Sequence, residues 1–199
     1  MKHLGTRTLN TNRLVLRRFR DDDAQTMFDN WARDPEVTRY LTWPLHDSIE
    51  VSRRVLSDWI SQYAQPDFYA WAITSKQDGD MPIGSISVVH KDDDIEMVDI
   101  GYCIGRAWWG NGITSEALNE LIRFFFNEVK VNRIQARHDP RNPNSGKVML
   151  KCGMKYEGTM RASSRNNQGI CDTSIYSILA KDFYEGDSFL QVLQEKSIL

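Results

Sequence analysis

The feature that most constrains this chain is a glycine-containing loop between a strand pattern and a long helix pattern. Residues 95–104 alternate as a strand does, and the loop Gly105-Arg106-Ala107-Trp108-Trp109-Gly110-Asn111-Gly112 follows. Ser115 to Val129 then carries an apolar stripe at helical spacing, formed by Ala117, Leu118, Leu121, Ile122, Phe125 and Val129. Backbone N–H groups point outward at a helix N-terminus, where the helix dipole also favours negative charge, so this order predicts an anion site.

Two nucleotide-binding motifs contain comparable glycines, and the loop matches neither. A Walker A loop requires Lys and then Ser or Thr after its second glycine, whereas Asn111 and Gly112 stand there. A dinucleotide fingerprint requires a third glycine where this chain has Ser115, and it opens a βαβ unit instead of following a meander. A bare Gly-x-Gly is more often a tight turn than a phosphate site, so the loop alone leaves both interpretations open.

The remaining elements predict an α+β fold. Strands are expected at residues 14–19, 68–74, 83–89, 95–104, 133–138, 154–161 and 173–180, and helices at 24–32, 47–63, 115–129 and 142–152. The strands over 68–104 form an antiparallel meander, and the glycine loop with its helix forms a crossover to the strand at 133–138. The helices and strands are therefore expected to pack together in one α+β fold.

Composition indicates one domain over residues 1–199. The chain has 199 residues, is 41% hydrophobic and contains no Gly/Ser/Pro-rich linker, so it can bury a core without disulfides or a metal. A net charge of −2 argues against nucleic-acid binding through overall positive charge. Three widely spaced cysteines without a C-x-x-C pair, and no long apolar run, predict a cytoplasmic protein with no membrane partner.

Three motifs carry a resemblance to a known family. Gly101-Tyr102-Cys103-Ile104 followed by Trp109-Gly110-Asn111-Gly112-Ile113-Thr114-Ser115-Glu116-Ala117 resembles the acetyl-CoA pyrophosphate loop of the GNAT N-acetyltransferases. The likeness is to the branch of ribosomal-protein N-terminal acetyltransferases (RimJ/RimL type), which the stretch from Asn142 to Met154 and the strand from Thr11 to Arg17 also resemble. The match covers a core of about residues 10–184 and leaves a C-terminal tail at 185–199. Ala107 departs from the Gln or Arg of the wider superfamily, and Met154 from the branch's usual Phe.

The resemblance implies an α/β/α layered fold and an acetyl-CoA site. The sheet would be mixed, mostly antiparallel and twisted, with a splayed parallel strand pair formed by Met97–Ile104 and Arg133–His138 and with flanking helices. Acetyl-CoA would be the co-substrate, and no metal is implied. The residues implied to bind it are Cys103, Ile104, Trp109, Gly110, Asn111, Gly112, Ile113, Thr114, Asn142, Ser145 and Lys147.

The resemblance also implies the catalytic groups. Ser145 would protonate or hydrogen-bond the leaving thiolate, although Asn142 and Ser145 are also ordinary helix-capping residues. The general base is expected at Glu96, with Asp99 second, and an ordered water alone could serve. Because Glu96 and Asp99 alternate along a strand, at most one of them faces the cleft.

Aromatic residues are candidates for the acceptor side of the cleft. Tyr40, Trp43, Tyr69 and Trp71 precede or lie on elements that line this side in the family, and aromatic rings can enclose a substrate chain or cation. Core packing is the competing interpretation, above all for Trp71. Cys103 is expected to be an inert packing residue, and the scattered His46, His90 and His138 have no metal-binding spacing.

The favoured hypothesis is an acetyl-CoA-dependent N-acetyltransferase that acts on a primary amine, either a protein N-terminus or a small molecule, in a ternary complex. One alternative is a non-catalytic acyl-CoA-binding module, and a weaker one is a nucleotide-phosphate binder that uses the same loop. A homodimer is compatible with the sequence.

Overall fold

The computed structural model describes residues 1–185 and places eight strands in one sheet. The strands are β1 (Leu9–Asn10), β2 (Leu14–Arg17), β3 (Ala70–Ser75), β4 (Pro82–Asp92), β5 (Met97–Ile104), β6 (Arg133–His138), β7 (Lys155–Asn166) and β8 (Gly169–Leu179). The α-helices are α1 (Ala24–Met27), α2 (Pro35–Thr38), α3 (Ile49–Gln62), α4 (Ile113–Phe124) and α5 (Pro143–Lys151). Short 3-10 turns lie at Asp21–Asp23 and Arg106–Trp108, and π-helical turns at Phe28–Ala32 and Phe125–Val129.

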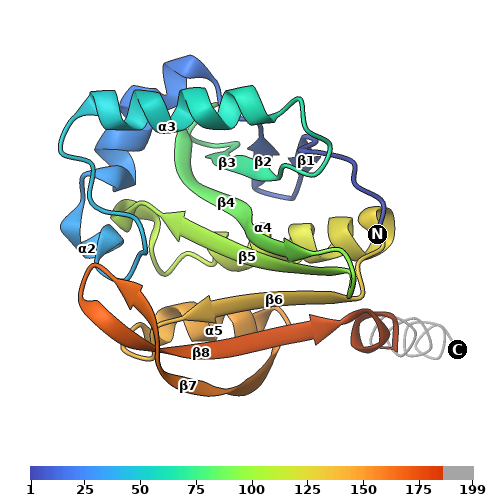
Figure 1. The fold of residues 1–199 in the computed structure, drawn as a ribbon. Coiled ribbons are helices and arrows are strands. Elements are labelled where there is room, and N and C mark those ends of the chain that lie inside the picture. The colour runs from blue at the N-terminus through green and yellow to red at the C-terminus, as the bar shows by residue number, and fades with distance from the viewer. Residues whose placement is uncertain (186–199) are drawn as a thin grey trace, which may run out of the picture.

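The sheet is antiparallel apart from one parallel pair. Its order is β1-β2-β3-β4-β5-β6-β8-β7, and only β5 and β6 run parallel (Figure 1). Their pairing ends at Asp99 opposite Gln135, although β5 continues to Ile104 beside β4 and β6 continues to His138 beside β8. The two strands therefore diverge, which confirms the predicted mixed sheet with a splayed parallel pair.

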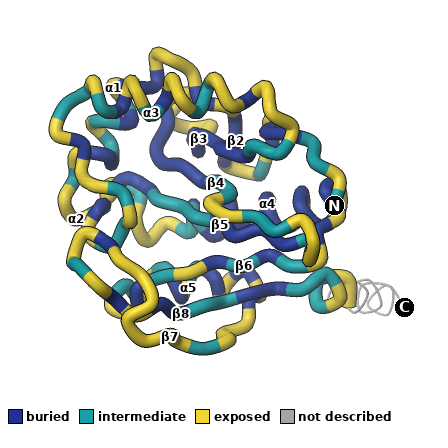
Figure 2. Tube along the Cα trace, in the orientation of Figure 1, coloured by how far each residue is buried: buried dark blue, intermediate teal, exposed yellow. Residues whose placement is uncertain are grey.

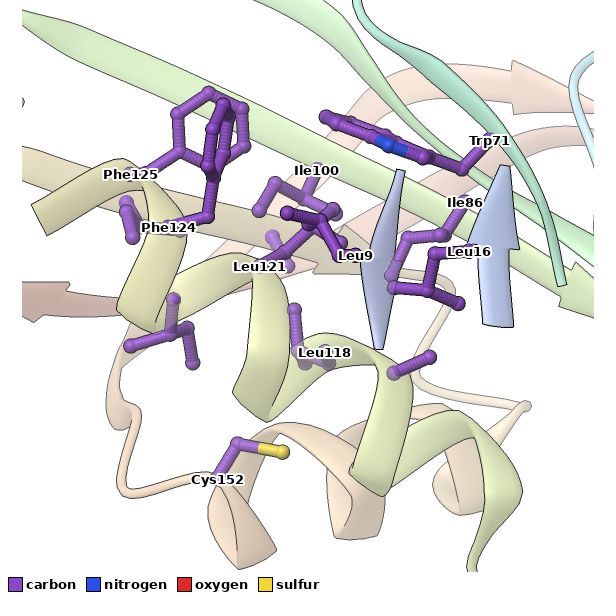
Figure 3. Packing of buried hydrophobic residues seen from close by; sticks show 14 of the residues in the cluster. Leu9, Leu16, Trp71, Ile86, Ile100, Leu118, Leu121, Phe124, Phe125 and Cys152 are labelled. Carbon is purple, nitrogen blue, oxygen red and sulfur yellow. The ribbon is translucent and has the colours of Figure 1, made fainter. Parts of the chain in front are cut away.

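Two apolar clusters cover the two faces of this sheet. The larger cluster joins Trp71, Ile86 and Ile100 of the sheet to Leu118 and Leu121 of α4 (Figure 3). The smaller cluster joins Ala72 of β3 to Trp31 and Leu56, which come from the segment after α1 and from α3. Figure 2 shows β3 and the first halves of β4 and β5 buried, and β7 exposed along most of its length. The sheet is thus the middle of three layers.

Element boundaries differ from the sequence predictions at several points. The long helix begins earlier, at Ile113, and its last turn is π-helical. The C-terminal hairpin is longer than predicted, and its tip reaches α2 (Figure 1). The two-residue strand β1 and the single turn α2 were not predicted, because neither is long enough to show a period. Residues 180–185 are helical, and residues 186–199 of the predicted tail (185–199) lie outside the described residues.

Over residues 1–185, no helix has the length and apolar character needed to cross a membrane.

Candidate active site

The glycine loop adopts the geometry that an anion site requires. Gly110 and Gly112 have φ values of +78° and +74°, in the left-handed region that favours glycine. Gly112 is the N-cap of α4, and its carbonyl accepts the N–H of Glu116 at 3.0 Å. The N–H groups of the first turn have no partner within the helix, so they remain available to a ligand at this end.

The loop is braced by an ion pair that sequence reasoning missed. Arg13 Nε donates to Glu116 Oε2 at 2.6 Å, and Arg13 Nη1 donates to the Asn111 carbonyl at 3.1 Å. Burial opposes ionisation of Glu116, yet hydrogen bonds from Thr11 and Arg13 hold its pKa below the usual value. On the other side of the loop, Trp109 Nε1 donates to the Ile104 carbonyl at 2.9 Å. The turn is therefore preorganised, and the signal that could have revealed it is the Arg13–Glu116 charge pair.

A cavity of about 480 Å³ lies between the start of α4, the end of β5 and α5. Every residue predicted to bind the cofactor lines it except Asn111, whose carbonyl faces Arg13. The lining members of that set are Cys103, Ile104, Trp109, Gly110, Gly112, Ile113, Thr114, Asn142, Ser145 and Lys147.

The first cavity is locally basic although the chain has a net charge of −2. Four cationic side chains line it, and one acidic side chain accompanies them. They are Arg39, Arg141, Lys147, Lys151 and Glu36. This local excess of positive charge suits a ligand that carries several phosphates.

A second cavity of about 460 Å³ meets the first where β5 and β6 diverge. The two cavities share six lining residues: Tyr40, Leu41, Tyr102, Cys103, Asn142 and Ser145. A ligand in one cavity can therefore reach a ligand in the other at this junction.

Ser145 is held at the junction by both sides of the cleft. Its hydroxyl accepts a hydrogen bond from Asn142 Nδ2 at 3.2 Å, and its backbone carbonyl accepts one from the Tyr102 hydroxyl at 3.0 Å. Burial raises the pKa of Tyr102, so this phenol stays protonated and acts as a donor at neutral pH. Tyr102 was quoted in the motif but not predicted as a site residue.

Asp99 lines the second cavity from β5, with a side chain only 1% exposed. Arg137 Nε lies 2.7 Å from its Oδ2, and Gln135 Nε2 donates to the same oxygen at 3.0 Å. Burial raises the pKa of Asp99, and Arg137 and Gln135 offset only part of that shift. Asp99 is therefore a buried carboxylate with enhanced basicity beside the junction.

Glu96, the preferred base in the sequence prediction, lies away from the cleft. It occupies the turn before β5, at φ +51°, and lines neither cavity. Its Oε1 accepts a hydrogen bond from the Met1 amine at 2.8 Å. Because β5 starts at Met97 and runs toward the glycine loop, Glu96 is at the far end of the strand.

The four predicted acceptor-side aromatics divide into two pairs. Tyr40 and Trp43 line the second cavity. Tyr69 and Trp71 do not, since they are 1% and 0% exposed and pack against the Phe124 and Phe125 rings. Figure 3 shows Trp71 in this core. The structure thus corrects the prediction for the second pair, whose face of the sheet is covered by α4.

Trp59 of α3 also lines the second cavity, although it was not among the predicted acceptor-side residues. Cys103 lies at the junction, where burial raises the pKa of its thiol to about 11. Since the thiolate is the nucleophilic form, this raised pKa disfavours a nucleophilic role for Cys103 at neutral pH. Within residues 1–185, no three His, Cys, Asp or Glu side chains are arranged to hold a metal ion.

The tip of the β7–β8 hairpin closes one side of the second cavity. Asn167 Nδ2 donates to the carbonyls of Thr38 and Trp43, at 2.8 and 2.9 Å, and its backbone N–H donates to Leu41 at 3.2 Å. Next to it, Asn166 Nδ2 donates to Asp139 Oδ2 at 2.7 Å. The hairpin therefore joins segments that are more than 120 residues apart in the chain.

Comparisons with known proteins agree with this geometry. The family model described as an acetyltransferase (GNAT) domain matches residues 13–155. The "Uncharacterized N-acetyltransferase YoaA" of Bacillus subtilis is 30% identical over 86% of this chain and 96% of its own length. The "[Ribosomal protein uS5]-alanine N-acetyltransferase" of Escherichia coli is 27% identical over 75% of this chain and 79% of its own.

Among solved structures, the chain resembles an acetyltransferase (GNAT family) from Bacillus anthracis with a TM-score of 0.77 and 23% identity, over 88% of this chain and 99% of that one. This likeness shows a common fold. Since the family model covers well over half of the sequence and the relatives are N-acetyltransferases, the chain belongs to the GNAT family and is an acetyl-CoA-dependent acyltransferase.

Proposed function

We propose that this enzyme transfers the acetyl group of acetyl-CoA directly to a primary amine, on a protein N-terminus or a small molecule, within a ternary complex. The observation that carries the proposal is the junction of the two cavities. One cavity has the phosphate-binding glycine loop, the other has aromatic and carboxylate side chains, and both reach Asn142 and Ser145. Two substrates bound at once would meet at this point.

The cofactor side of the cleft is suited to acetyl-CoA. The pyrophosphate would accept hydrogen bonds from the loop and the first turn of α4, over residues 109–114, and Lys147 adds positive charge nearby. The pantetheine arm would lie between the diverging ends of β5 and β6, where backbone groups of the two strands no longer pair with each other. A backbone N–H near Cys103 or Ile104 would polarise the thioester carbonyl.

The amine must lose a proton before it attacks, and Asp99 is the carboxylate on the acceptor side that supports this role. Its pKa is raised by burial, which brings a carboxyl group closer to the pKa that general-base catalysis at neutral pH favours. Because the side chain is only 1% exposed, the proton would move through a water in the second cavity. Arg137 holds the carboxylate in place.

The departing thiolate needs a proton or a hydrogen bond, and Ser145 can supply one. The Ser145 hydroxyl accepts from Asn142 Nδ2, so its own O–H remains free to donate to sulfur. The amide of Asn142 then acts as an orienting group for that hydroxyl. A Ser145→Ala variant is expected to lower kcat more than it raises the KM for acetyl-CoA, and an unchanged kcat would contradict this role.

Direct attack is favoured over a covalent acetyl-enzyme. Cys103 is the thiol at the junction, and its pKa of about 11 leaves little thiolate at neutral pH. We therefore expect sequential kinetics, with double-reciprocal lines that intersect, and no acetyl group on the protein after incubation with acetyl-CoA alone.

The decisive experiment is an amine screen with acetyl-CoA, read by release of free thiol and by the mass of the product. The panel contains peptides with N-terminal alanine or serine, a polyamine, free amino acids and an aminoglycoside, because the name of one relative specifies alanine on a ribosomal protein. Turnover of a primary amine supports the proposal. Tight CoA binding without turnover on any amine would instead favour a non-catalytic acyl-CoA-binding module.

A further inference from the structure

His138, the last residue of β6, has an unusual hydrogen-bonding state. Its Nδ1 lies 2.8 Å from the backbone carbonyl oxygen of Asp139. A carbonyl only accepts, so Nδ1 carries the ring proton and Nε2 carries a lone pair in the neutral ring. Over the described residues 1–185, His138 Nε2 is the single buried side-chain nitrogen or oxygen that has no hydrogen-bond partner. Such an atom in a folded protein calls for an explanation.

Gly146, the fourth residue of α5, leaves the space that the His138 ring occupies. A Cβ at this position would lie 2.8 Å from His138 Nε2, 3.2 Å from its Cε1 and 3.2 Å from the Tyr176 hydroxyl. Glycine weakens a helix interior relative to alanine, and Gly146 does not have a positive φ that would require glycine. The glycine is therefore required by the imidazole ring, which occupies the place of a side chain.

This contact lies directly beside the reaction centre. Gly146 follows Ser145 in α5, and His138, Asn142 and Ser145 all line the second cavity. From the other strand, the Tyr102 hydroxyl donates to the Ser145 carbonyl at 3.0 Å. The first turn of α5 is thus held by β5 through Tyr102 and packs against β6 through His138.

We propose that the contact between the His138 ring and Gly146 positions the first turn of α5 over the splayed strands and so orients the Ser145 hydroxyl toward the thioester sulfur. His138 acts as a positioning residue, because its Nε2 is not accessible to a ligand. The inference rests on the proposed function and adds a residue pair to it.

The first test is a double-mutant cycle that uses coenzyme A itself as the probe. Gly146→Ala is expected to lower the melting temperature and to weaken CoA binding about tenfold, because the new methyl displaces the ring or the helix. In a His138→Ala background, Gly146→Ala should lower CoA affinity by at most about twofold, since the space is then open and alanine favours a helix more than glycine does. Leu150→Ala, on an exposed residue of the same helix, is the matched control and should leave CoA affinity unchanged.

The second test separates the two ring nitrogens. In His138→Asn, the side-chain amide can still donate to the Asp139 carbonyl as Nδ1 does, while the Nε2 side of the ring is lost. We expect kcat on the best amine of the screen to fall about tenfold or more, with the KM for acetyl-CoA changed less than about threefold. A purely structural role would instead lower the melting temperature and leave kcat unchanged.

The outcomes distinguish the two proposals. If the unmodified protein does not bind CoA, the proposed function fails and this inference fails with it. If CoA binds and Gly146→Ala costs the same affinity with or without His138, the positioning contact alone is refuted. If CoA binds but no amine is acetylated, the binding cycle still decides the inference.

Discussion

Replacement of Asp99 by asparagine tests the acid–base chemistry of this cleft most directly. The change keeps the size of a side chain that is 1% exposed and removes its charge. General-base catalysis contributes typically about 10²–10⁴-fold, so kcat/KM should fall by at least about a hundredfold. That fall corresponds to about 2.7 kcal/mol of transition-state stabilisation.

The loss of activity can be separated from a loss of stability. Asp99→Asn would leave Arg137 without its carboxylate partner, and breaking a fully buried pair costs about 3–5 kcal/mol. The Arg137 side chain is 44% exposed, however, so water can solvate the freed guanidinium and the expected cost is about 1–2 kcal/mol. Urea denaturation should therefore show a folded variant under assay conditions.

The pH dependence provides the second readout. Burial raises the pKa of Asp99 above its usual 3.8, and the base acts only when it is deprotonated. In the wild type, kcat/KM should rise with pH through that raised value, and Asp99→Asn should abolish this limb of the profile.

Glu96→Gln is the matched control, because it neutralises a carboxylate three residues earlier that lines neither cavity. It should keep wild-type kcat/KM and the same pH profile. The assignment of the base to Asp99 is refuted if Asp99→Asn retains kcat/KM within about threefold of the wild type. It is also refuted if Glu96→Gln lowers kcat/KM as much as Asp99→Asn does.

Three further predictions concern the loop, the hairpin and acid stability. Gly112→Ala should weaken CoA binding and destabilise the protein by about 1–2 kcal/mol, measured by calorimetry and thermal melting, because φ is +74° there. Asn167→Ala should lower stability by about 1 kcal/mol and speed amide exchange over residues 38–43, since it loses two bonds to carbonyls; Gln168→Ala, in the next residue of the same turn, should do neither. Arg141 is the largest cause that lowers the pKa of Asp139, from 3.8 to about 2. Because the folded-state pKa of Asp139 is depressed, its ionised form stabilises the fold above about pH 4, and this stabilisation is lost as pH falls toward 2. Urea denaturation of Asp139→Asn at several pH values across this range should lack this pH-dependent stabilisation.

The position of the glycine loop at one end of the candidate cleft could be predicted from sequence because the loop is local. Gly110, Gly112 and the first turn of α4 lie within a few consecutive residues, and their chemistry comes from backbone groups that any helix start exposes. Asn142 and Ser145 likewise lie in one turn. A contiguous motif of this kind specifies its own geometry, and only Asn111 is directed elsewhere, by the distant Arg13.

Which of the two candidate carboxylates lies in the cleft could not be predicted, because the start of β5 was unknown. With a strand that begins at residue 95, Glu96 and Asp99 differ only in the face they occupy. In the structure a positive φ at Glu96 ends the preceding turn, and the strand begins after it. Alternation from Met97 then puts Asp99, Gly101 and Cys103 on one face, the face of α3, and all three line the second cavity.

The acceptor half is harder to predict because it is assembled from distant segments, and the aromatic residues show why. Alternation indicates that Tyr69, just before β3, and Trp71 of β3 lie on the same side of the sheet, but not which helix covers that side. A face with such large side chains needs a partner that can fill a deep layer, and Phe124 and Phe125 of the long helix supply it. On the opposite face, Ser85, Ser87 and Gly101 line the second cavity, so small residues of β4 and β5 leave room for a cleft, which Trp43 and Trp59 then enclose from outside the sheet. In a three-layer fold of this kind, the face with the smaller strand residues is therefore the better place to search for the acceptor.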